Sequence, residues 1–157
     1  MDEIIIRRAA AEEWDEAMEL AFKVFLKFEA KEYGEEGTEA FANFITDEML
    51  RKLFLAGHYI LYVAKRNGKI IGLISMRNGN HISLLFVDPL YHKMGIGRSL
   101  VEKLVEYLKT YTDQKLLTVN AAPSAIEFYR RLGFFETGEL TRQDGIIYLP
   151  MELDYCY

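Results

Sequence analysis

The sequence predicts an α/β (α+β) fold in which helices flank a mixed, mostly antiparallel central sheet. Three β-rich runs follow one another in the middle of the chain, joined by Asn-Gly dipeptides that tolerate positive φ and favour tight hairpins. Segments with apolar residues at helical spacing precede and follow these runs. From end to end, the patterns predict the element order βααβββαβαββ.

One strand and two helices are expected in the first third of the chain. The strand covers residues 4–7, the first helix 11–33 and the second helix 38–55, each predicted from the spacing of its apolar residues. Gly34 and Gly37 are expected to separate the two helices, because glycine weakens a helix interior.

The central strands are expected over 59–65, 69–77 and 81–87. Asn67-Gly68 and Asn78-Gly79 join them, so the three runs form an antiparallel meander.

Two helices and three strands are expected after the meander. They are a helix over 95–111, a strand over 116–119, a short helix over 123–132, and two strands over 134–140 and 146–153.

Composition limits the class of protein. The 157 residues have the length of one domain and contain no repeat or linker, so a single domain over 1–157 is expected. No apolar run reaches the ~18 residues of a membrane span. The acidic start of the chain and the single Cys156 favour a cytoplasmic protein. A formal net charge of −5 argues against a nucleic-acid partner.

A glycine turn between the third central strand and the following helix is the first candidate site. Gly95 and Gly97 let the main chain approach a ligand closely, and the first N–H groups of the helix are free to bind an anion. A phosphate or pyrophosphate fits such a turn. Taken alone, the glycine pair also fits an ordinary strand-to-helix connection.

Two motifs together carry a resemblance to a known family. The first is the run Val87-Asp88-Pro89 followed by His92 and by Gly95-Ile96-Gly97; the second is the run Ala125 to Phe134, which contains Phe128-Tyr129 and ends in Gly133-Phe134. In order and spacing they resemble those of the GCN5-related N-acetyltransferases. Members of that family move an acetyl group from acetyl-CoA to an amine.

The resemblance implies acetyl-CoA as cosubstrate and an amine as acceptor, with no metal. The strand edge before the turn would pair with the pantetheine arm and polarise the thioester carbonyl, and the turn would hold the pyrophosphate through backbone amides. The residues expected to bind acetyl-CoA are Leu85, Phe86, Val87, His92, Lys93, Met94, Gly95, Ile96, Gly97, Arg98, Ser99, Asn120, Ser124 and Phe128.

The resemblance also implies that Tyr129 is the general acid of a direct attack in a ternary complex. A phenol with a pKa of ~10 is protonated at neutral pH and can donate a proton to the departing thiolate. The residues leave the general base open. His81 and Ser83 on the central strands and two acids of the helical region, Glu29 and Glu32, are the candidates.

Two positions depart from the family pattern. His92 stands where relatives usually have Gln or Arg, which makes any contribution to phosphate binding pH-dependent. Asn120 lies two residues farther from the tyrosine than the corresponding asparagine of many relatives, a position that Ala122 takes here.

Other interpretations stay open at this point. The chain could be a CoA-binding regulatory or interaction domain without turnover, and Tyr129 could be an ordinary core aromatic. The acceptor could be a small molecule or a protein amine. No metal site is expected, because no cluster of Cys, His or Asp surrounds His81 or His92.

Two surface features suggest partners. The acid-rich segment 29–39 is either a solvated loop between two helices or a means of attracting a cationic amine. The apolar C-terminal strand over 146–153 and the tail Tyr155-Cys156-Tyr157 are expected to be exposed, which makes a homodimer plausible.

Overall fold

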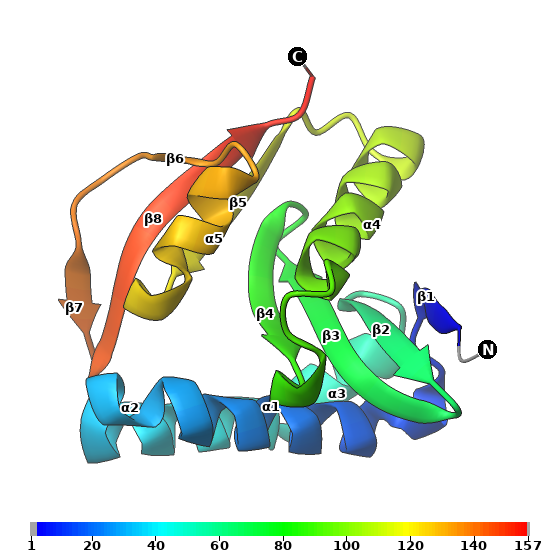
Figure 1. Ribbon diagram of the computed structural model, residues 1–157, viewed down its shortest axis with the longest axis horizontal. Helices are drawn as coiled ribbons and strands as arrows, with labels where there is room; N and C mark the ends of the chain where they lie inside the picture. Colours follow the sequence, from blue (N-terminus) through cyan, green and yellow to red (C-terminus); the bar gives the residue numbers. More distant parts are fainter. Residues whose placement is uncertain (1–2, 157) are drawn as a thin grey trace.

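A central sheet with helices on both faces organises the computed structural model, which describes residues 3–156 (Figure 1). The strands are β1 (Ile4–Arg8), β2 (Ile60–Arg66), β3 (Lys69–Arg77), β4 (His81–Val87), β5 (Leu116–Ala121), β6 (Phe135–Glu136), β7 (Thr141–Gln143) and β8 (Ile146–Asp154). The helices are α1 (Trp14–Phe28), α2 (Ala30–Ile45), α3 (Glu48–Leu55), α4 (Ile96–Tyr111) and α5 (Ile126–Arg131). Short 3-10 turns cover Ala11–Glu13, Pro89–Tyr91 and Pro123–Ala125.

The sheet has the strand order β1-β2-β3-β4-β5-β8-β6, with β7 paired to β8. Every pair is antiparallel except β4 with β5, which is parallel. The predicted mixed, mostly antiparallel sheet is confirmed. A parallel pair requires a crossover, and α4 is the crossover here.

The predicted meander is also confirmed, and its turns have the expected chemistry. Asn67 and Gly68 both have positive φ (51° and 75°), as do Asn78 and Gly79 (53° and 83°). Few residues adopt this left-handed conformation cheaply, and asparagine and glycine are the two best suited to it.

The helices before the meander are three, where two were predicted. Gly34 interrupts the helical backbone as expected, with φ 72° and ψ −168° at a kink within α2, whereas Gly37 lies within the helix. The predicted first helix divides earlier, at Glu29, between α1 and α2. The predicted second helix divides near Thr46, because the Asp47 carboxylate accepts hydrogen bonds from the N–H groups of Met49 and Leu50 and so caps a new helix.

The C-terminal strands also differ from the prediction. The expected strand over 134–140 is reduced to the two residues of β6, and β7 is a further strand that was not predicted; the two pair with different parts of β8. The C-terminal strand β8 is paired on both sides, by β5 and by β6, so it is not the exposed edge that was expected. Its apolar side chains Leu149 and Met151 are buried in the core, and this burial accounts for them without a second copy of the chain.

Two hydrophobic clusters lie on the two faces of the sheet. One contains α4 residues such as Leu100 and Leu104 with Tyr129 of α5; the other contains α1 residues such as Trp14 and Phe25 with Phe86 of β4. Alternating β4 side chains contribute to both clusters, as a strand between two layers must.

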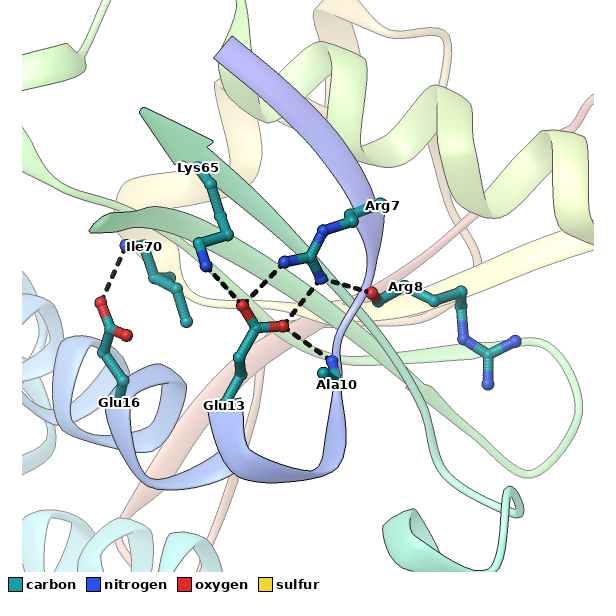
Figure 2. A network of polar contacts seen from close by, with 7 residues as sticks. All are labelled: Arg7, Arg8, Ala10, Glu13, Glu16, Lys65 and Ile70. Atoms are coloured by element: carbon teal, nitrogen blue, oxygen red, sulfur yellow. Dashed lines mark hydrogen bonds and ion pairs between the residues drawn. The ribbon is translucent and has the colours of Figure 1, made fainter. Parts of the chain in front are cut away.

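A polar network fixes the start of α1 to the far edge of the sheet (Figure 2). The buried Glu13 carboxylate accepts hydrogen bonds from Arg7 (2.8 and 2.9 Å), Lys65 (2.6 Å) and the Ala10 N–H (2.7 Å). Glu16 accepts from the Ile70 N–H at 2.9 Å. This network lies away from the candidate site, so we assign it a structural role.

Within residues 3–156, no helix combines the length and the apolar character that crossing a bilayer requires.

Candidate active site

The first two residues of β4 pair with the middle of β5. His81 lies opposite Thr118 and Ile82 opposite Val119, and no further pair follows. From Leu84 to Val87, β4 is therefore paired on one side only, with β3. This leaves backbone groups of β4 available to a ligand that could lie along the strand edge.

A cavity of about 550 Å³ opens where the two strands separate. Its walls include Leu84, Leu85 and Phe86 of β4, together with Tyr129 of α5. Tyr129 belongs to the core cluster on one face of the sheet and Phe86 to the cluster on the other. The cavity thus connects the two faces of the sheet at the point where pairing stops.

Tyr129 is held by aromatic neighbours. The Tyr129 ring lies 5.1 Å from the rings of Phe128 and Phe134, edge to face in both cases. Burial, followed by the nearby Glu29 and Tyr33, raises the pKa of Tyr129 above its usual value of 10.0. The phenol is therefore protonated at neutral pH, and its hydroxyl has no hydrogen-bond partner among the described residues.

Glu29 lines the same cavity from the junction of α1 and α2. Its backbone is fully bonded: the N–H donates to Phe25 O (2.8 Å), and the carbonyl accepts from Glu32 and Tyr33 (3.0 and 3.1 Å). The Glu29 side chain makes no helix-capping bond. Burial, with a smaller contribution from Glu32, raises the pKa of this carboxyl to about 7, and the Tyr33 hydroxyl partly opposes the shift.

The two polar side chains of β4 considered as bases, His81 and Ser83, contact Thr118 and Tyr59. The His81 Nδ1 atom lies 2.7 Å from Thr118 Oγ1, and burial with nearby Arg77 lowers the pKa of the imidazole to about 4. Ser83 Oγ accepts a hydrogen bond from the Tyr59 hydroxyl at 2.9 Å. His81 is thus neutral at pH 7 and a weak base.

The glycine turn has the backbone of an anion site. Lys93 and Gly95 are both left-handed (φ 64° and 78°), and α4 begins immediately afterwards at Ile96. Alternating left-handed residues direct successive N–H groups toward one point. Ser99 N–H is already bonded to Gly95 O at 3.0 Å, so the free donors precede Ser99.

Gly97 brings the two sequence motifs into contact. A Cβ atom at this position would lie 3.1 Å from the Phe128 ring, closer than ordinary van der Waals contact. The absence of a side chain at Gly97 lets α5 approach the first turn of α4. The turn and the Tyr129 helix are therefore fixed to each other.

His92 is bound to the strand that precedes it. The His92 Nε2 atom lies 2.8 Å from Val87 O, which can only accept, so this nitrogen carries a proton. The ring also lies 5.4 Å from the Phe28 ring at the end of α1. One carbonyl of the β4 edge is thereby occupied by a side chain of the turn.

The remaining predicted residues divide into two groups. Leu85, Phe86 and Asn120 line the cavity, as Tyr129 does. Ser124 is exposed in the turn before α5 and does not line it. Met94 and Arg98 are exposed beside the glycine turn.

Sequence reasoning named Glu29 as one of four candidate bases and missed most other residues of the cavity wall. Those with polar or charged side chains include Tyr33, Arg77 and Tyr148. A signal for Glu29 was present: it lies four residues after the buried Phe25, on the apolar face of α1. An acid at such a position is unusual, because an unpaired charge is costly to bury.

The acid-rich segment is helical rather than a loop. It forms the first half of α2, where Glu32, Glu35, Glu36 and Glu39 are exposed. Of the acids over 29–39, only Glu29 lines the cavity.

The β7–β8 hairpin closes one end of the cavity, with Gln143, Asp144 and Ile146 in the wall. It touches α2 backbone to backbone. A Cβ on Gly37 would lie 2.7 Å from Gly145 O, and a Cβ on Gly145 would lie 2.7 Å from Gly37 N. Only two glycines permit this contact, which explains a glycine inside α2.

Comparison with protein families identifies the group to which this architecture corresponds. The family model described as an acetyltransferase (GNAT) domain matches residues 29–155. The chain belongs to the GNAT acetyltransferase family. The expectation drawn from the two motifs is confirmed, since both lie within the matched residues.

Curated GNAT relatives are distant. An uncharacterized N-acetyltransferase of Methanocaldococcus jannaschii is 28% identical over 143 residues, or 83% of this chain and 60% of the relative. N-acetyltransferase family 8 member 2 of Rattus norvegicus is 29% identical over 57% of this chain and 44% of its own length. The chain spans about half the length of the curated relatives it matches.

Solved GNAT structures share the fold over nearly the whole chain. A GCN5-related N-acetyltransferase from Rhodopseudomonas palustris superposes with a TM-score of 0.82 at 24% identity, covering 98% of this chain and 97% of that one. PaiA N-acetyltransferase from Thermoplasma acidophilum, solved in complex with coenzyme A, gives a TM-score of 0.78 at 20% identity, covering 98% and 99%.

Proposed function

We propose that this protein is an N-acetyltransferase that moves the acetyl group of acetyl-CoA to a primary amine within a ternary complex. The observation that carries the proposal is the position of Tyr129. Tyr129 lines a cavity beside the unpaired edge of β4, and its phenol is protonated at neutral pH. Family membership and a solved neighbour in complex with coenzyme A support the same cosubstrate.

The donor end of the site follows from the glycine turn and the strand edge. The free N–H groups of residues 93–98, with Lys93 and Arg98 beside them, suit the negative charge of a pyrophosphate. The β4 edge over Leu85 and Phe86 suits the amides of a pantetheine arm. Of the acetyl-CoA contacts expected from the sequence, those of Ser99 N–H and Val87 O are already used within the protein.

Acetyl-CoA supplies an activated acyl group and a thiolate leaving group. A β4 backbone N–H polarises the carbonyl, where negative charge develops as the amine attacks. Tyr129 donates its proton to the sulfur as the carbon–sulfur bond breaks. The resulting phenolate takes the proton that the new amide nitrogen must lose, so Tyr129 ends the cycle protonated.

The test is thiol release from acetyl-CoA in the presence of primary amines, for wild type and Tyr129→Phe. We expect release in the wild type and a fall in kcat of about 10²-fold or more in the variant. Tyr111→Phe is the matched control, because Tyr111 is exposed on α4 and outside the cavity.

A binding measurement separates the proposal from its alternative. Tyr129→Phe should bind CoA with nearly wild-type affinity, since the hydroxyl acts at the sulfur and not at the pyrophosphate. Tight CoA binding without thiol release for any amine, small or peptidyl, would instead favour the non-catalytic CoA-binding domain.

A further inference from the structure

Acetyl transfer needs a group that removes a proton from the acceptor, because a primary amine in water at neutral pH is mostly an ammonium ion with no lone pair for attack. The inference below rests on the proposed function. It concerns which residue of this chain accepts that proton.

Few residues in the cavity could act as the base. Among the described lining residues, the titratable side chains other than tyrosine and arginine are Glu29, His81 and Asp144. His81 is neutral and weakly basic for the reasons given above. Asp144 is exposed in the turn of the β7–β8 hairpin, where water surrounds its carboxylate.

Glu29 differs from both. Glu29 is half-buried in the cavity wall, and within residues 3–156 no lysine or arginine forms an ion pair with it. A carboxyl in such a site holds its proton more tightly than an exposed one and is a stronger base once ionised.

Glu29 lies close enough to Tyr129, the proposed general acid, for its charge to act on the phenol. Tyr33 and Glu32 of α2 act on its charge, and the Glu29 charge in turn acts on Tyr129 of α5. Arg77, His81 and Tyr148 line other parts of the same cavity. The Glu29 carboxyl and the Tyr129 phenol thus line the same cavity, and their environments suit them to opposite tasks.

We propose that Glu29 is the general base, which takes a proton from the ammonium group of the acceptor as it enters the cavity. The nitrogen–hydrogen bond breaks, and the proton passes to a Glu29 oxygen and later to solvent. The amine left behind attacks the thioester carbonyl. Tyr33 is a positioning residue whose hydroxyl partly stabilises the ionised carboxylate.

The first experiment compares two acceptors of nearly equal size, ethylamine and 2,2,2-trifluoroethylamine. Fluorine makes the second so weakly basic that its nitrogen carries no proton at neutral pH, and it needs no base for the first step. Glu29→Gln should lower kcat/KM for ethylamine by about 10²-fold and for the fluorinated amine much less. Glu35→Gln, an exposed acid of the same segment, is the matched control and should change neither.

The pH profile is the second readout. Wild-type kcat/KM for the fluorinated amine should be nearly flat through neutral pH, whereas that for ethylamine should fall as Glu29 is protonated below about pH 7. Glu29→Gln should lose that fall, and Glu29→Asp should restore part of the activity. Equal losses for both amines, or an unchanged acidic limb in Glu29→Gln, would overturn the proposal while leaving acetyl transfer intact.

A stability measurement tests the premise without using activity. Because burial raises the pKa of Glu29 from 4.5 to about 7, its ionisation costs folding stability as the pH rises through that interval. Glu29→Gln should therefore raise Tm relative to wild type at about pH 8 and not at about pH 4. A lower Tm for the variant at about pH 8 would contradict a buried, unpaired carboxylate. If no amine yields thiol release in the wild type, both the function and the role of Glu29 fail together, whatever the Tm.

Discussion

At the scale of single residues, the two glutamates that flank α1, Glu13 and Glu29, have pKa values shifted in opposite directions. Glu13 is buried among Arg7, Lys65 and a backbone N–H, and the Arg7 hydrogen bond is the largest cause that lowers its pKa to about 2. Glu29 is half-buried and forms no ion pair with a lysine or arginine of residues 3–156, and burial raises its pKa to about 7. The first holds the fold, and the second is suited to accept protons.

Glu13→Gln should destabilise the protein at neutral pH by about 2 kcal/mol, because it removes charge-assisted hydrogen bonds from a buried site. The folded-state pKa lies below the ordinary 4.5, so the contribution is present above about pH 5 and is lost as the pH falls toward about 2. Urea unfolding at several pH values measures this. A difference in unfolding free energy between wild type and Glu13→Gln that stayed constant down to about pH 2 would contradict this prediction. The control is Glu12→Gln, because Glu12 is exposed beside Glu13.

At the scale of elements, contacts between glycines and their neighbours set how closely segments approach. Gly97 lets α5 lie against α4, and Gly37 lets the β7–β8 hairpin lie against α2. The first contact lies at the glycine turn, and the second lies where the β7–β8 hairpin contributes to the cavity wall. Each gives a separate prediction.

Gly97→Ala should lower both stability and CoA affinity. The new Cβ would lie 3.1 Å from the Phe128 ring, and forcing the helices apart costs about 1–3 kcal/mol and shifts the glycine turn. Calorimetric titration with CoA and thermal unfolding measure the two effects. Alanine is otherwise about 1 kcal/mol better than glycine in a helix, so a gain in stability would show that the contact imposes no constraint.

Gly37→Ala should weaken binding of the acceptor amine and leave binding of the CoA donor unchanged. A Cβ there would lie 2.7 Å from Gly145 O, so the hairpin must move away from α2 and the wall formed by Asp144 and Ile146 with it. We expect a raised KM for the amine with an unchanged Kd for CoA. A change confined to CoA binding would contradict the division of the cavity into two ends.

At the scale of the whole molecule, the separation of β4 from β5 opens a cavity in the middle of the sheet, lined by residues of both hydrophobic clusters. The proposed mechanism requires acetyl-CoA and the amine to occupy this site together. The only cysteine, Cys156, is exposed near the C-terminus and outside the cavity. The cavity therefore supplies no thiol to carry the acetyl group between substrates.

Steady-state kinetics should reflect this arrangement. Double-reciprocal plots at several amine concentrations should intersect, as they do for a ternary complex, because the amine attacks acetyl-CoA directly. Mass spectrometry after incubation with acetyl-CoA alone should detect no acetylated enzyme. Parallel lines together with a stable acetyl-enzyme would require a covalent mechanism.

The parts of this molecule that local chemistry controls could be predicted. The Asn-Gly hairpins, the helix after the glycine turn and the apolar faces of α1 and α4 follow from backbone preferences and periodicity. The division between α2 and α3 was missed although Asp47 has the chemistry of a helix cap, because the apolar spacing continues across it.

The sequence by itself determined the fold class, the order of most elements and the two motifs that show family membership, since each depends on neighbours close along the chain. Tertiary structure alone decided three things: that β4 and β5 separate after two pairs, that β8 lies inside the sheet, and that Glu29 shares a cavity with Tyr129. Strand pairing and burial depend on residues far apart in the chain. The spacing from Phe25 marks Glu29 as an unusual acid, but the cavity that raises its pKa is formed by segments far apart in the chain.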